Sequence, residues 1–120
     1  SVESLMSNVQ GNISLIGSTK ENADVYLRGL ADFNTRPEPD RTQFMIMITS
    51  IYTGLDTIYW SYRHGNLDSD LWRRECNMIQ MYLRTEGGRA VFEFNEDAGM
   101  FTSDFSQYVR SELMDDKTKG

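Results

Sequence analysis

Apolar side chains recur every three or four residues along most of this chain, which is the periodicity of amphipathic helices. The longest continuous pattern lies between residues 41 and 72. Its first part carries a stripe of apolar residues that would occupy one side of a helix of about six turns: Phe44, Ile48, Ile51, Leu55, Ile58 and Tyr62. We therefore predict a long central helix around which the other segments pack.

The predicted central helix is apolar beyond that stripe. Further side chains lie beside or behind it and widen the apolar surface past the narrow face of an ordinary surface helix: Met45, Met47, Tyr52, Tyr59 and Trp60. Such a helix is either enclosed by the rest of the domain or meets a second copy of the chain. The pattern makes self-association through this helix the first partner hypothesis.

A helical hairpin is predicted where the central helix ends. Gly65 follows His64 at a position that suits a left-handed residue after a helix, and Asp68 can cap the next helix. Leu67 and Trp72 occupy the two positions of a hydrophobic staple around that cap. We expect the two helices joined by this turn to be antiparallel.

The remaining segments predict four more helices. Ser18 or Thr19 can cap the second helix, whose inward side chains are expected to include Leu27. In the helix after the hairpin, Glu75 is expected to face water. The predicted fold is an all-α single domain of five to six helices in an antiparallel bundle, with helices at roughly 2–16, 19–33, 40–64, 69–85, 88–97 and 103–114.

Three segments bear on where the predicted helices begin and end. Both prolines lie in residues 34–40, which have to separate the second helix from the central one. Residues 89–95 have strand propensity, but a helix is preferred because a lone strand would have no partner. Residues 115–120 are predicted to form a solvated tail.

Composition narrows the class of protein. The chain has 120 residues, and 39% of them are apolar, which is enough for one packed core. The formal charge of −6 repels polyphosphate and makes nucleic acid an improbable partner. No apolar run approaches the roughly 20 residues of a membrane span. A single cysteine, Cys76, excludes an internal disulfide framework and fits a reducing compartment such as the cytoplasm.

Candidate sites for metals and anions are few. His64 is the sole histidine, so a site with several histidine ligands is excluded by count. Asp68, Asp70 and Glu75 do not follow the spacing of a calcium loop, and helix capping explains the first two. We predict no metal and no cofactor. Gly87, Gly88 and Arg89 could hold an anion at a helix start, although a simple turn explains them as well.

Catalysis finds little support in the sequence. An enzyme built on Glu93, Asp97 or Asp104 near His64 and Arg89 would require a convergence that their positions in the sequence do not display. No catalytic residue is therefore predicted.

Aromatic residues with polar tips gather around the predicted hairpin. Rings of this kind can line a pocket for a flat or amphipathic ligand, or they can form a core and an interface. The candidate ligand or interface residues are Tyr52, Tyr59, Trp60, Tyr62, Arg63 and Trp72.

Four motifs resemble a widespread group of uncharacterised bacterial proteins. In order and spacing they are YLRGLADF (26–33), IYWSYRHGNLDSDLW (58–72), TEGGRAVFEF (85–94) and FTSDFSQYV (101–109). Members of the group have an N-terminal membrane helix, a short basic stretch and a small helical domain. The resemblance implies an all-helical domain on the cytoplasmic side of an inner membrane, and it implies no activity. This chain lacks the membrane helix, so any membrane attachment is expected only through a segment absent from it. Residues 92–95 also replace a segment that often carries more Trp and Arg in the group.

Together these patterns predict a helical protein-interaction or regulatory domain that forms homodimers. The alternative is a sensor of a small hydrophobic or aromatic ligand that uses the aromatic hairpin.

Overall fold

The computed structural model describes residues 1–114, and every regular element in this part of the chain is helical. A 3₁₀ turn, η1 (Phe33–Thr35), follows the second helix, and a π-helical turn, η2 (Val109–Leu113), continues the sixth. The α-helices are α1 (Val2–Ile16), α2 (Lys20–Asp32), α3 (Asp40–Arg63), α4 (Ser69–Leu83), α5 (Glu86–Asp97) and α6 (Ser103–Tyr108). The predicted all-α single-domain bundle is confirmed. The predicted tail, residues 115–120, lies outside the described residues.

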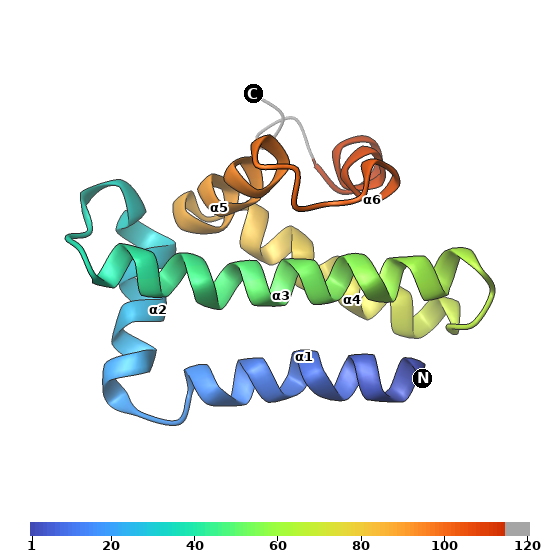
Figure 1. The fold of residues 1–120 in the computed structure, drawn as a ribbon, viewed down its shortest axis with the longest axis horizontal. Coiled ribbons are helices and arrows are strands. Elements are labelled where there is room, and N and C mark those ends of the chain that lie inside the picture. Colours follow the sequence, from blue (N-terminus) through green and yellow to red (C-terminus); the bar gives the residue numbers. More distant parts are fainter. Residues whose placement is uncertain (115–120) are drawn as a thin grey trace.

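The long helix α3 is the centre of the fold (Figure 1). Helix α1 runs along one side of α3, and α5 and α6 lie on the other side. Helix α2 crosses near the start of α3, and α4 returns along α3 after the hairpin turn. The predicted inward stripe is buried, and its first five members, Phe44, Ile48, Ile51, Leu55 and Ile58, have no exposed surface.

Short polar side chains set where the helices begin. The Asp68 carboxylate accepts a hydrogen bond of 2.7 Å from the Asp70 N–H and caps α4, as the sequence predicted. Thr19 caps α2 by accepting from the Asn22 N–H at 3.0 Å. Gly65 has φ +76°, the left-handed conformation expected after α3.

Two predicted orientations are wrong. Glu75 is only 3% exposed, because it lies three residues after Trp72 and four before Ile79, on the buried face of α4. Its carboxylate lies 3.3 Å from the Arg74 guanidinium. Leu27 is exposed, because the neighbouring Tyr26 takes the inward position and its hydroxyl donates to the Tyr82 hydroxyl at 3.0 Å.

Helix length and hydropathy together decide whether a helix can cross a bilayer. Within residues 1–114, none of the helices combines the length and the hydropathy that this requires.

Candidate functional site

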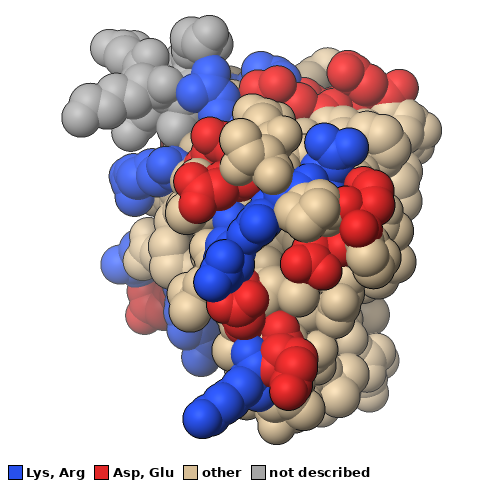
Figure 2. Space-filling view, turned by 90° about the vertical axis from the view of Figure 1, so that its left-hand side faces the viewer, with Lys and Arg blue, Asp and Glu red and all other residues tan. Residues whose placement is uncertain are grey.

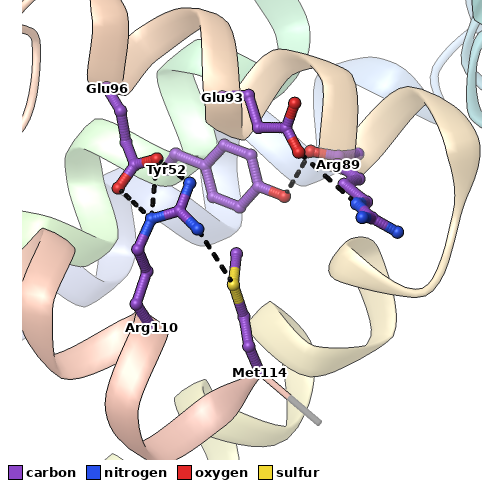
Figure 3. A network of polar contacts seen from close by, with 7 residues as sticks. Tyr52, Arg89, Glu93, Glu96, Arg110 and Met114 are labelled. Carbon is purple, nitrogen blue, oxygen red and sulfur yellow. Dashed lines mark hydrogen bonds and ion pairs between the residues drawn. The ribbon is translucent and has the colours of Figure 1, made fainter. Parts of the chain in front are cut away.

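Three of the predicted aromatic site residues belong to the core. Tyr52, Tyr59 and Trp72 are buried within one chain. The Tyr52 hydroxyl donates to the Gly88 carbonyl oxygen at 2.8 Å, which ties α3 to α5 (Figure 3). The ring of Tyr59 lies 4.9 Å from that of Tyr108 and 5.4 Å from that of Trp72. The sequence suggested an interface with a second copy that includes Tyr52 and Tyr59. The interface cannot be centred on these two residues, because α4, α5 and α6 already cover them.

Burial also fixes the protonation of the core phenols. Desolvation, with a smaller contribution from Tyr82, raises the pKa of Tyr52 well above its ordinary value. Desolvation likewise raises the pKa of Tyr108 to about 12, although the hydrogen bond of 3.1 Å from the Trp72 indole N–H acts in the opposite direction. These phenols therefore stay neutral and act as hydrogen-bonded packing groups.

The other three predicted residues, Trp60, Tyr62 and Arg63, lie at the hairpin end of α3. Tyr62 stacks on Trp72 with 5.3 Å between ring centroids, and Arg63 pairs with Asp104 of α6 at 3.0 Å. Trp60 presents a large ring to solvent, because it is 58% exposed. Its ring lies 4.2 Å from the His64 imidazole, whose Nδ1 is 2.8 Å from the Trp60 carbonyl oxygen. The exposed indole is thus held in place by its neighbour.

The side of α3 that faces away from the core carries a second stripe, which the sequence analysis missed. It consists of Ile46, Ser50, Thr53, Thr57 and Trp60, and we call it the outer stripe. Steps of four and three residues place these side chains on one face of the helix. Ile46 at one end is 64% exposed. The signal in the sequence was the same alternating spacing that revealed the inward stripe.

The hydroxyl groups of the outer stripe are satisfied within α3. Ser50 donates to the Ile46 carbonyl oxygen at 2.9 Å, Thr53 to that of Thr49 at 2.9 Å, and Thr57 to that of Thr53 at 3.2 Å. Such back-bonding leaves the outer surface of these residues with methyl and methylene groups. The stripe can therefore lose its water without leaving hydroxyl donors unpaired.

Two hollows flank Ile46. A hollow of about 400 Å³ lies between α1 and α3, where Leu15, Ile46 and Met47 form its apolar part and Asn12, Asn22 and Gln43 its polar part. Another of about 290 Å³ lies between α3 and α5, lined mainly by Met45, Ile46 and Phe94. Of the described residues, none that lines either hollow is charged. We call the outer stripe and these two hollows together the outer surface.

Charged side chains gather elsewhere. Figure 2 shows Lys and Arg interspersed with Asp and Glu on the face that forms the left-hand side of Figure 1. Many are neutralised by neighbours on the same helix, such as Arg28 with Asp24 at 2.8 Å on α2 and Arg89 with Glu93 at 3.4 Å on α5. Charge of mixed sign gives no single-sign field that would attract nucleic acid.

The residues considered for anion binding take part in helix packing. The Gly88 N–H donates to the Thr85 side chain at 2.9 Å, which caps α5. A Cβ built on Gly87 would lie 2.0 Å from the Gly29 carbonyl oxygen. The glycine pair is thus explained by a cap, which uses the Gly88 N–H, and by a close helix crossing.

The acid and base groups considered for catalysis are divided among separate contacts. Asp104 pairs with Arg63, and Glu93 pairs with Arg89, while His64 contacts Trp60. Among residues 1–114, no cluster of three or more His, Cys, Asp or Glu could hold a metal ion.

Comparisons with known protein families, with curated proteins and with solved structures find no match to this chain. Its function is therefore inferred from the residues and contacts described above.

Proposed function

We propose that this domain is a non-catalytic interaction module that associates with a second copy of itself through the outer surface. The observation that carries the proposal is the group of exposed apolar side chains, Leu15, Ile46 and Phe94, around two hollows without charged lining. Contiguous apolar surface of this kind marks interaction sites, and the centres of protein interfaces are depleted in charge.

The net charge supports this choice of surface. Two copies that each carry a formal charge of −6 repel one another overall. The outer surface adds no close contact between like charges to that repulsion, because the residues that line its hollows are uncharged. The hydroxyl groups of the outer stripe are also already bonded within α3. Contact there therefore removes apolar surface from water at little electrostatic cost.

The mass of the protein in solution tests the proposal. Light scattering over a range of micromolar concentrations is expected to give the mass of two chains for the wild type and of one chain for Ile46→Glu. Met81→Glu is the matched control, because Met81 is 50% exposed on α4 and lines neither hollow. Circular dichroism should show all three proteins equally helical. A wild type that stays monomeric at every concentration would overturn the proposal.

A second candidate function, binding of a small hydrophobic or aromatic ligand, is supported at a different place from the aromatic hairpin. A hollow of about 290 Å³ between α1, α2 and α4 is lined by apolar residues and by Tyr26 and Tyr82, whose hydroxyls are hydrogen-bonded to each other. We propose 1-naphthol as the probe, since it combines a flat ring with one hydroxyl. A thermal shift that Leu27→Arg abolishes and Ile46→Glu preserves would support this candidate, and no shift would remove it.

We further propose a cytoplasmic location, with any attachment to an inner membrane made through a segment outside this chain. The support is the single buried thiol of Cys76 and the resemblance of the four sequence motifs to the bacterial group. Fractionation of cells that express the full-length protein would test it.

A further inference from the structure

The two ends of the outer stripe are equally far from its middle residue. Ile46 precedes Thr53 by seven residues, and Trp60 follows Thr53 by seven. Small residues, Ser50 and Thr57, lie between the centre and each end. A twofold axis through Thr53 would therefore place Ile46 of one antiparallel α3 opposite Trp60 of the other. Most homodimers use such a self-complementary contact, in which residue i meets j and j meets i.

We infer that two copies pair through antiparallel α3 helices, with Trp60 of each copy seated in a hollow beside Ile46 of the other. This inference rests on the proposed self-association and adds its orientation and its register. The two ends of the stripe lie about 21 Å apart along the helix axis, from a rise of about 1.5 Å per residue. One contact at each end therefore fixes both the direction and the offset of the partner helix.

The centre of the stripe suits a close approach of two helices. Ser50, Thr53 and Thr57 are small, and their hydroxyls donate to carbonyl oxygens of α3 itself. Helix axes can approach more closely where the side chains at the contact are small. The large side chains at the two ends then reach past the facing helix toward the hollows.

Trp60 has the properties of an anchor residue. It is exposed in the single chain and offers a large ring, and its contact with His64 restricts that ring before any partner binds. Tryptophan is enriched among residues that dominate binding energy, and a side chain already held in place loses less entropy on binding. A matching receptor lies on the same surface, since the hollows of about 400 and 290 Å³ both include Ile46 in their lining.

A parallel pair of α3 helices would not bring Trp60 of either copy to a hollow of the other. It would place Trp60 against Trp60 and leave the hollows of the two copies facing each other without a side chain to fill them. The macrodipoles of two aligned helices would also oppose the parallel arrangement and favour the antiparallel one. The antiparallel register is the one in which each anchor meets a hollow.

A charge-exchange experiment separates the register from self-association itself. Ile46→Glu and Trp60→Lys are each expected to be monomeric, because each places a charge against an apolar partner at both ends of the pair. Mixing the two variants, with an affinity tag on one, is expected to restore a mixed dimer. In that dimer, the introduced carboxylate of one copy meets the introduced ammonium of the other at one end, and the native Trp60 and Ile46 meet at the other end.

The control for this exchange moves the positive charge off the outer surface. Tagged Ile46→Glu is mixed with Met81→Lys. Position 81 is on α4 and lines neither hollow. The introduced carboxylate then faces a native Trp60 and has no ammonium to pair with. We expect the tagged variant to recover less partner from this mixture than from the mixture with Trp60→Lys.

Each result has a definite meaning. Recovery of the mixed dimer, measured as at least a tenfold gain in apparent affinity over either variant alone, supports the antiparallel register. A dimeric wild type with disrupted single variants but no recovery on mixing would overturn the register and leave the proposed self-association intact. A monomeric wild type would overturn both.

Discussion

The backbones of α2 and α5 touch where Gly29 meets Gly87. A Cβ built on Gly87 would lie 2.0 Å from the Gly29 carbonyl oxygen, and one built on Gly29 would lie 2.1 Å from the ring of Phe44. Phe44 is fully buried at the start of α3. This crossing therefore holds α2, α3 and α5 together.

Gly87→Ala is expected to destabilise the fold by about 1–3 kcal/mol or more, as added atoms do in a tightly packed site. The neighbouring atom is backbone, so a side-chain rotation cannot relieve the clash.

Gly11→Ala is the matched control, since a Cβ there meets nothing within 4 Å and Gly11 lies inside α1. That control should gain about 0.5–1 kcal/mol from helix propensity. Urea denaturation followed by circular dichroism measures both. Equal stabilities for the two variants would contradict the close crossing.

The helices were predictable because their burial follows local periodicity. The inward stripe of α3 could be identified from spacing alone, as could the turn at Gly65 and the cap at Asp68. The role of Gly87 and Gly88 could not, because a helix crossing depends on which distant segment approaches. The sequence shows the two glycines, and only the fold brings Gly29 to them.

The candidate site was predictable only in part. The breadth of apolar surface on α3 indicated more than one contact face, but it pointed to Tyr52 and Tyr59, which α4, α5 and α6 cover. Trp60 was among the predicted residues and is exposed. Ile46 was not, because its surroundings become hollows only when α1 and α5 pack beside α3.

Cys76 is expected to react slowly with thiol reagents in the folded protein. It is buried on α4, with its sulfur 3.8 Å from the Tyr108 hydroxyl, and burial raises its pKa. Less thiolate and less access both slow the reaction. Labelling with 5,5′-dithiobis(2-nitrobenzoate) should therefore accelerate on urea unfolding by at least tenfold. Complete labelling within the mixing time in native buffer would contradict the buried position.

Asp56 links α3 to the start of α6 and is expected to contribute more stability in acid than at neutral pH. Its carboxylate accepts from the Thr102 N–H at 2.7 Å and from the Thr102 hydroxyl at 2.8 Å. Burial raises the pKa of Asp56 above its ordinary 3.8, although the bonds from Thr102 oppose this. The folded chain then binds this proton more tightly than the unfolded chain does, so the contribution is present below pH 3.8 and is lost as the pH rises through the folded pKa.

The difference between Asp56→Asn and the wild type isolates that effect from the other carboxylates. The free energy of unfolding of the variant should improve relative to the wild type as the pH rises above 3.8. Urea denaturation at several pH values between acid and neutral conditions measures it. A difference that does not change with pH would show that Asp56 has an ordinary pKa.

Glu96 is expected to titrate with the opposite sign. Burial alone would raise its pKa, but hydrogen bonds from Arg110 and from the Ser106 hydroxyl outweigh it and lower the pKa below 4.5. Figure 3 shows Arg110 reaching from η2 to this carboxylate on α5, where its Nε lies 2.9 Å from one oxygen. The stabilisation is therefore present above pH 4.5 and is lost as the pH falls through the folded pKa.

Glu96→Gln should lose stability relative to the wild type at neutral pH and approach it in acid, whereas Asp56→Asn should show the reverse trend. Parallel trends in the two single variants would contradict the opposite environments that the structure gives these carboxylates.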